Sequence, residues 1–173
     1  MRLGLVVWTA DIGGTMRRSV PILAMAIVAV EVTGSAMAAQ GPLDAKAIQI
    51  VAKTFDFLSH KPARDAKVVV VGGAADLAAA RSSLGKMAVS EGAAGDAAGA
   101  FAVLVNTPEQ ARAARAVNGT VLTVGSDVSC VIAGACLTAV ETQPKVTIYV
   151  SRAVAQATGV EFDPNFKMLI TEK

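Results

Sequence analysis

The sequence is short of the residues that catalysis and metal binding use most. It holds one histidine, two cysteines and one tyrosine in 173 residues, and aromatic side chains make up 4% of it. No serine lies in a G-x-S-x-G turn, and no H-E-x-x-H or D-x-D spacing occurs. Histidine is the side chain best suited to acid–base work near neutral pH, but His60 lies at the expected end of a helix beside Lys61. These absences predict a protein that is not an enzyme and that binds no metal or cofactor.

The chain also lacks an apolar run long enough to cross a membrane as a helix. The best candidate, residues 19–30, is twelve residues long and ends at Glu31, whereas a spanning helix needs about 20. The Arg17-Arg18 pair precedes this run, and the small-x-small sequence of residues 36–38 follows it. Such a pattern predicts a cleavable Sec-type signal peptide, cut after residue 38, and a protein of the periplasm. A retained anchor and a buried helix are the alternatives, and residues 1–15 fit an upstream extension from a misplaced start codon.

Clustered charge is missing from the rest of the chain. Residues 39–173 contain thirteen of the 16 Lys and Arg and twelve of the 14 Asp and Glu, which is a net charge of +1. Their densest basic group is Lys61, Arg64 and Lys67, which Asp65 interrupts. Without a basic cluster, this segment has no electrostatic footprint for nucleic acid. Its 135 residues are enough for one domain with one core.

Apolar residues in residues 39–173 come in blocks typical of alternating helices and strands. The four valines at 68–71, bounded by Lys67 and Gly72-Gly73, predict a strand buried on both faces, as in a parallel sheet between helices. The expected helices cover residues 43–58, 76–84, 108–117, 152–158 and a short segment from 164. The expected strands cover residues 68–71, 87–89, 101–105, 120–124, 137–141 and 145–150. The pattern predicts an α/β fold: a single three-layer domain with a mixed, mostly parallel sheet, helices on both faces and a C-terminal hairpin.

Local signals indicate both ends of the helix at 108–117. Thr107, Pro108 and Gln110 fit a capping box with proline at the first helical position. Asn118-Gly119 is expected to stop the helix in left-handed geometry. The segments 91–100, which has three glycines, and 126–136, which holds the cysteines, are expected to be loops.

The two cysteines, Cys130 and Cys136, lie in the part of the chain that is expected to be exported. In an oxidising compartment such a close, even pair favours a disulfide; a metal or redox site is the alternative, and the histidine is far away in sequence. A ring this small contributes about 2 kcal/mol, which is enough to shape one loop. Val131 and Ile132, between the sulfurs, are then either an exposed apolar surface for a partner or part of the core.

Two further sets of residues are candidates for binding. Phe57 lies off the apolar stripe of the first expected helix, so it is a partner-contact candidate, whereas the other phenylalanines are expected in the core. Gly72, Asn106 and Gly125 follow buried strands, and α/β sheets bind small ligands at the carboxyl ends of their parallel strands. The Gly72-Gly73 pair lacks the G-x-G-x-x-G and G-K-[ST] patterns of phosphate loops, which favours a plain turn.

Six features of the chain resemble, in the same order, those of a known protein family. They are the Phe-Asp-Phe-Leu of residues 55–58, the strand and turn of 68–73, the segment 101–108, the Leu-Thr-Val-Gly of 122–125, the cysteine pair, and residues 146–151 with Ala153, Ala157, Gly159 and Val160. On these residues the chain resembles the YfiR-like family of periplasmic regulators, which carry a DUF4154 domain. The family's Trp-Pro after the first helix and its Gly-Gly-Met before the penultimate strand are absent.

The resemblance implies a regulator that acts by binding and has no catalytic activity. The family's characterised members are dimers that bind the periplasmic part of an inner-membrane diguanylate cyclase and repress it, which lowers cyclic di-GMP and biofilm formation. Cys130 and Cys136 fall where some members carry a short-range disulfide. A periplasmic small-ligand binding module without a cyclase partner is the alternative expectation.

Overall fold

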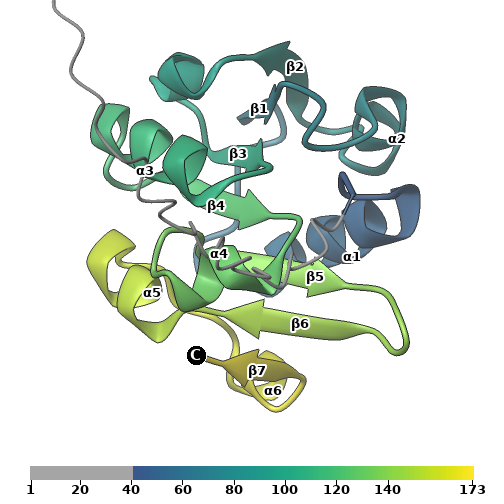
Figure 1. The fold of residues 1–173 in the computed structure, drawn as a ribbon, viewed down its shortest axis with the longest axis vertical. Coiled ribbons are helices and arrows are strands. Elements are labelled where there is room, and N and C mark those ends of the chain that lie inside the picture. Colours follow the sequence, from purple (N-terminus) through teal and green to yellow (C-terminus); the bar gives the residue numbers. More distant parts are fainter. Residues whose placement is uncertain (1–40) are drawn as a thin grey trace, which may run out of the picture. The chain divides into compact units, whose positions relative to one another are not determined.

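The computed structural model describes residues 41–173, so the expected signal peptide and upstream extension lie outside the described residues. In chain order the elements are α1 (Ala45–Asp56), β1 (Lys67–Val71), α2 (Leu77–Ser83), β2 (Ala88–Gly92), the 3-10 helix η1 (Ala94–Ala97), β3 (Ala102–Val105), α3 (Pro108–Val117), β4 (Leu122–Gly125), α4 (Val128–Ile132), β5 (Thr138–Glu141), β6 (Thr147–Val150), α5 (Arg152–Thr158), α6 (Pro164–Lys167) and β7 (Ile170–Glu172). Helices and strands alternate along most of this part of the chain (Figure 1).

One sheet of seven strands runs through the described residues, in the order β2-β1-β3-β4-β5-β6-β7. Neighbouring strands from β2 to β5 pair in parallel, β5 and β6 pair antiparallel, and β7 pairs parallel to β6. The predicted α/β fold with a mixed, mostly parallel sheet is therefore confirmed, and the predicted hairpin is the β5–β6 pair. Because parallel strands end at one edge of a sheet, the residues that follow β1, β3, β4 and β5 lie along a common carboxyl edge.

Helices cover both faces of the sheet, and each face has its own core. The first core joins the sheet to α1, α2, α5 and α6, and the second joins it to η1, α3 and α4. The valines of β1 alternate between them: Val68 and Val70 belong to the first core, Val69 and Val71 to the second. In Figure 1, α1 and α2 lie to the right of β3 and β4, and α3 lies to the left.

Side chains at the helix ends account for several element boundaries. Thr107 Oγ1 accepts a hydrogen bond from Gln110 N at 3.3 Å, and Gln110 Oε1 accepts one from Thr107 N at 3.3 Å, which confirms the predicted capping box. Ser151 caps α5 in a similar way by accepting from Val154 N at 3.3 Å. Gly159 ends that helix in left-handed geometry, with φ of 69°.

The predicted stop of α3 is wrong in its geometry. Asn118 ends the helix in extended backbone, with φ of −138°, rather than in the left-handed region. Its side-chain amide donates hydrogen bonds to Ala97 O at 3.3 Å and to Ala100 O at 2.9 Å. These tertiary contacts connect the end of α3 to the last residue of η1 and to the segment that follows it, and they override the local preference of the Asn-Gly pair.

Two predicted loops contain helices, and one strand was not predicted. The segment 91–100 includes η1, which Asp96 stabilises by accepting a hydrogen bond from Ala93 N at 2.7 Å. The segment 126–136 includes α4, which Asp127 caps by accepting from Ser129 N at 2.6 Å. The unpredicted strand is β7, which has three residues and pairs with β6 at the edge of the sheet.

Candidate functional site

A hollow of about 990 Å³ lies along the outer side of α1. Towards α2 it is lined by residues 82–87, and on its other side Phe57, at the end of α1, stacks on Phe166 of α6 with ring centroids 4.9 Å apart. Ile50 and Phe57 are two turns apart and therefore share one side of the helix. We call the part of the hollow that lies on this side of α1, away from residues 82–87, the α1–β6 groove. Its apolar residues are Ile50, Phe57, Val146, Ile148, Phe166 and Leu169.

The α1–β6 groove collects exposed apolar side chains. Three of the six large apolar side chains that are exposed in residues 41–173 line it: Phe57 is 37% exposed, Val146 46% and Leu169 67%. Phe166 lies buried beneath them, and the two isoleucines pack partly buried against the first core. Contiguous apolar surface of this kind is typical of sites that bind another protein or a ligand.

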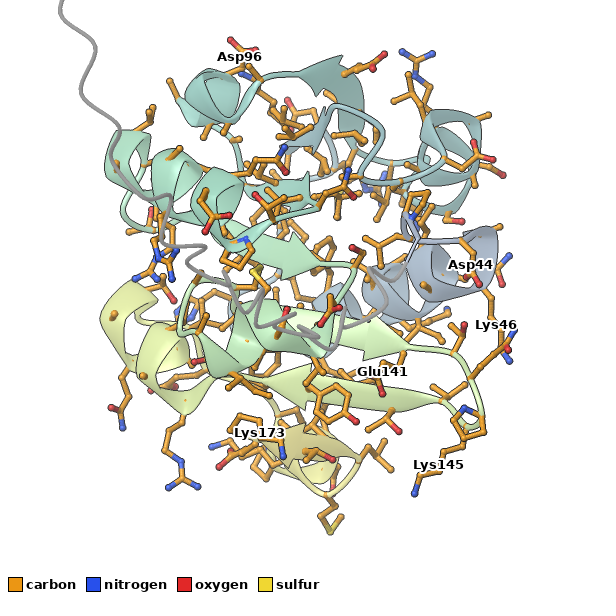
Figure 2. The ribbon with its side chains drawn as sticks, viewed as in Figure 1. Asp44, Lys46, Asp96, Glu141, Lys145 and Lys173 are labelled. Atoms are coloured by element: carbon orange, nitrogen blue, oxygen red, sulfur yellow. A yellow bond between two sulfur atoms is a disulfide. The ribbon has the colours of Figure 1, made fainter. Side chains whose placement is uncertain are left out.

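The hollow has more lysines than carboxylates in its lining. Lys46, Lys53 and Lys86 line the hollow, against a single carboxylate from Asp56. Lys53 pairs with Asp56 at 3.8 Å, whereas in residues 41–173 no carboxylate lies at ion-pair distance from Lys46 or Lys86. Figure 2 shows Lys46 on α1 and Lys145 at the β5–β6 turn on the same side of the molecule. The rim of the hollow is therefore positive.

The β5–β6 hairpin forms the wall of the groove that faces α1. Thr142 Oγ1, in the hairpin turn, donates a hydrogen bond to Asp44 Oδ2 at 3.2 Å. Asp44 Oδ1 also caps α1 by accepting from Ala47 N at 2.6 Å, so one carboxylate joins the turn to the start of the helix. Alternation along β6 turns Ile148 towards the first core and Tyr149 towards the second.

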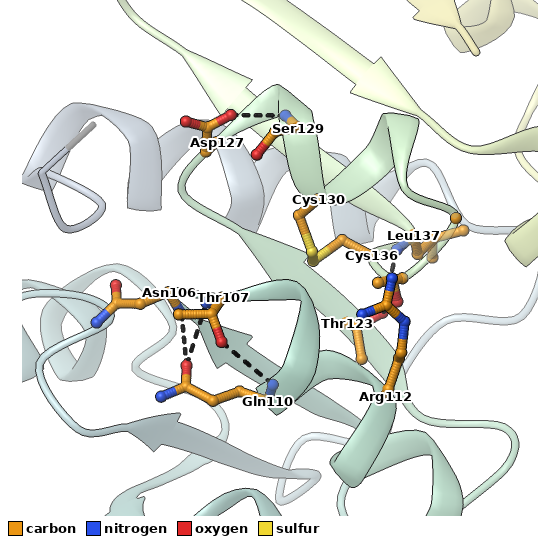
Figure 3. The surroundings of a disulfide bond; sticks show 12 residues. Asn106, Thr107, Gln110, Arg112, Thr123, Asp127, Ser129, Cys130, Cys136 and Leu137 are labelled. Carbon is orange, nitrogen blue, oxygen red and sulfur yellow. Dashed lines mark hydrogen bonds between the residues drawn. A yellow bond between two sulfur atoms is a disulfide. The ribbon is translucent and has the colours of Figure 1, made fainter. Parts of the chain in front are cut away.

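On the opposite face of the sheet, Cys130 and Cys136 form the predicted disulfide, with their Cα atoms 5.2 Å apart. Both cysteines are buried in the second core. Beside the bridge, Thr123 Oγ1 donates to Ala135 O at 3.1 Å and accepts from Leu137 N at 3.0 Å (Figure 3). The bridge and these two hydrogen bonds fix the path of the chain from α4 into β5.

The two apolar residues between the cysteines point in different directions. Val131 is 2% exposed and packs in the second core, whereas Ile132 is 66% exposed. They lie on one short helix, where consecutive side chains diverge by about 100°. Of the three predicted partner-binding residues, Phe57 therefore lies in the groove, Ile132 is exposed on the other face of the sheet, and Val131 is inaccessible to a partner because the core covers it.

Gly125, predicted to bind a ligand, is buried against the disulfide. A Cβ atom at this position would lie 2.9 Å from Cys136 Sγ and 3.1 Å from Cys130 Cβ. Since protein interiors are close-packed, a side chain at Gly125 would have to displace the bridge. The glycine is thus explained by packing, and it is not open to a ligand.

The other two predicted ligand residues, Gly72 and Asn106, meet at the carboxyl edge of the sheet. Asn106 Nδ2 donates a hydrogen bond to Gly72 O at 3.3 Å, between the ends of β1 and β3. Further along the same edge, a cavity of about 340 Å³ lies beside β4 and β5. Its polar lining comes from Asp44, Ser126 and Glu141 among others, and none of the three predicted ligand residues lines it.

One titratable pair stands out beside this cavity. Tyr149 Oη donates a hydrogen bond to Glu141 Oε2 at 3.0 Å. That hydrogen bond to a carboxylate, together with desolvation, raises the pKa of Tyr149 because both favour the neutral phenol.

The remaining predictions about chemistry concern histidine, metals and membranes. His60 is exposed, at the turn that follows α1. Within residues 41–173, no cluster of three or more His, Cys, Asp or Glu side chains could hold a metal ion. None of the helices in that part of the chain has the length and the apolar content needed to cross a membrane.

Neither a protein-family model nor a curated protein matches the chain. Two of the segments on which the expectation of a YfiR-like regulator rests contribute to the groove: residues 55–58 supply Phe57, and residues 146–151 supply Val146 and Ile148. Sequence reasoning identified Phe57 and missed the others. The groove is made by α1, the hairpin and α6, which are far apart in the sequence, so no local pattern indicates it.

Proposed function

We propose that this protein is an exported regulator that acts by binding another protein. Following the YfiR-like resemblance, its partner is the periplasmic part of an inner-membrane diguanylate cyclase, which it represses as a dimer, and the result is lower cyclic di-GMP and less biofilm. The observation that carries the proposal is the α1–β6 groove, an apolar surface with Phe57, Val146 and Leu169 at its rim.

The groove supports a protein partner more than a small ligand. Protein-binding sites are open surfaces with aromatic and aliphatic side chains at their centre, whereas small-ligand pockets enclose most of the ligand and add convergent polar groups. Phe57 at the rim stacks on Phe166 at the floor, so the groove presents a pair of aromatic rings. Among residues 41–173, the polar side chains that line the hollow are those of Lys46, Gln49, Lys53, Thr54, Asp56, Ser82, Ser83 and Lys86. The hydroxyl of Thr54 is already engaged, because it donates to Ile50 O at 3.0 Å.

The test is the level of cyclic di-GMP in cells that lack the gene. Deletion should raise cyclic di-GMP, and the full chain should restore the original level. A version without residues 1–38 should stay in the cytoplasm and fail to restore it. Restoration by both versions would contradict action in the periplasm, and an unchanged level on deletion, with export of the full chain verified, would contradict cyclase repression.

A second candidate function, small-ligand binding, is favoured by the cavity at the carboxyl edge of β4 and β5. It has a volume of about 340 Å³ and carries Ser126, Glu141 and Thr142 in its lining. In this reading the protein is a periplasmic binding module without a cyclase partner. Thermal unfolding with a panel of small polar metabolites tests it, since a ligand at a hundred times its dissociation constant adds about 2.7 kcal/mol. No stabilisation by any metabolite would count against it.

A further inference from the structure

The α1–β6 groove has the length and direction of a helix-binding site. It follows α1 from Lys46 to Phe57, which is about 16 Å, or three helical turns. One wall is a helix and the opposite wall is a β-hairpin, with an apolar floor between them. Grooves of this form bind an amphipathic helix, whose side chains at every third or fourth position enter the floor.

The charge of the rim restricts what the groove can hold. Lys46 and Lys53 line the hollow on α1 against the single carboxylate of Asp56. Lys46, which has no carboxylate at ion-pair distance within residues 41–173, lies on the same side of α1 as Ile50 and Phe57. The chain's own apolar segment at residues 19–30 is preceded by the Arg17-Arg18 pair, so it would bring positive charge to a positive rim. Two copies related by a two-fold axis would also place lysines against lysines.

We infer that the α1–β6 groove binds an amphipathic helix with acidic flanks, presented by a partner protein. The apolar stripe of that helix packs on Phe57, Val146 and Leu169, and its Asp or Glu side chains pair with Lys46 and Lys53. The inference rests on the proposed function, because it describes the segment that the regulated partner presents.

The groove is concave, which favours a protein helix over a membrane surface as its binding partner. Peripheral membrane binding inserts apolar side chains that protrude from a surface. Phe166, Ile50 and Ile148 lie instead on the floor of a hollow, where a flat bilayer cannot reach them but a helix can. A protein helix therefore fits the groove better than anionic lipid does.

The test uses two designed peptides and the purified protein, residues 39–173. Each peptide has about 18 residues, enough for five turns, with leucine at every third or fourth position and a fluorescent label. One peptide carries glutamate on the flanks and its twin carries lysine. Fluorescence anisotropy should give a dissociation constant below about 100 μM for the acidic peptide and binding at least about tenfold weaker for the basic twin.

Two variants locate the binding site, each with a matched control elsewhere. Leu169→Ser should weaken binding of the acidic peptide about tenfold, whereas Ile132→Ser, at an equally exposed position, should leave it unchanged. Lys46→Glu should weaken it about threefold to tenfold at low salt and less at about 0.5 M salt, whereas Lys61→Glu should have no effect. Circular dichroism checks that all four variants remain folded, as expected for exposed positions.

Several results would overturn the inference. They are equal binding of the two peptides, no binding of the acidic peptide below about 1 mM, and equal effects of Leu169→Ser and Ile132→Ser. Binding to vesicles with anionic lipid that Leu169→Ser abolishes, without peptide binding, would assign the groove to membranes instead. The proposed function is tested separately. Unchanged cyclic di-GMP on deletion would contradict cyclase repression but would not affect the assignment of the groove. Full complementation by Leu169→Ser would show that repression does not use the groove, without contradicting repression itself.

Discussion

The α1–β6 groove and the disulfide loop, residues 130–136, both bring apolar side chains to the surface, but they do so in different ways. The groove gathers Phe57, Val146 and Leu169 from three separate segments around one hollow. Of the two large aliphatic side chains in the loop, only Ile132 is exposed, whereas Val131 packs in the core beside the buried bridge. The disulfide therefore fixes the packing of the second core, whereas the exposed apolar surface of the groove comes from separate elements that do not close over it.

The β5–β6 hairpin connects the two regions. Its pleat sends Ile148 to the groove side and Tyr149 to the disulfide side. The disulfide side is closed by α4, which packs on β5, while none of the helices within residues 41–173 covers the corresponding strip between α1 and α6 on the groove side. Substitutions on the two sides should therefore separate effects on stability from effects on binding.

The largest effect on stability is expected at the floor of the groove. Phe166→Ala removes a buried ring that stacks on Phe57 and lies 5.4 Å from the ring of Phe162, so it should cost about 3–5 kcal/mol. Phe57→Ala removes a ring from the rim and should cost only about 1–2 kcal/mol, mainly the lost stacking. Urea unfolding measures both. Equal losses would mean that the rim of the groove is packed as tightly as its floor.

On the disulfide side, the next largest effect is expected from Gly125→Ala. The new methyl group would lie 2.9 Å from Cys136 Sγ, so the bridge and its neighbours must shift, at a cost of about 1–3 kcal/mol. Gly119→Ala is the matched control, because a Cβ there meets no atom within 4 Å. Thermal unfolding of both variants, under oxidising conditions, tests this. A Gly125→Ala protein as stable as the control would contradict the close packing around the bridge.

Much of the fold could be predicted because its signals are local. The valines at 68–71 indicate a buried strand, and Thr107, Pro108 and Gln110 indicate the start of α3, without reference to any distant residue. Where the prediction is wrong, distant atoms decide the structure: the amide of Asn118 bonds to Ala97 and Ala100 instead of stopping the helix in left-handed geometry. Helix α4 was missed because its five residues are too few for a periodic pattern.

The candidate site could be predicted only in part, for a related reason. Phe57 was found because its position off the apolar stripe of α1 is visible in the sequence. Val146 and Leu169 lie in short segments, directly after Lys145 and Met168. Nothing in the local sequence of those segments indicates that the two residues line the same hollow as Phe57. Gly125 looked like a ligand residue because it ends a strand, while the disulfide that requires a glycine there comes from later in the chain.

A smaller difference is expected between the two neighbours on α4. Val131→Ala deletes two buried methyl groups and should cost about 1–2 kcal/mol, whereas Ile132→Ala should change the stability by less than about 0.5 kcal/mol. Chemical denaturation of the two variants compares them directly. Neither should alter binding of the acidic peptide, since both lie across the sheet from the groove. A loss of binding with Ile132→Ala would instead assign partner contact to the disulfide loop.

The smallest effect is expected on the titration of Tyr149, the only tyrosine in the chain. Its hydrogen bond to Glu141 raises the pKa of the phenol above the ordinary value of about 10. The neutral phenol therefore stabilises the fold fully below the pKa of the unfolded chain, and this stabilisation is lost as the pH rises through the higher pKa of the folded protein. Absorbance at alkaline pH follows this single phenol directly. Glu141→Gln should move the midpoint down towards that of the unfolded chain, while Glu91→Gln, on the far edge strand β2, should not. Because Tyr149 faces the disulfide side of the hairpin, Glu141→Gln should also leave peptide binding unchanged, and a parallel loss of binding would show that the two faces of the hairpin are not independent.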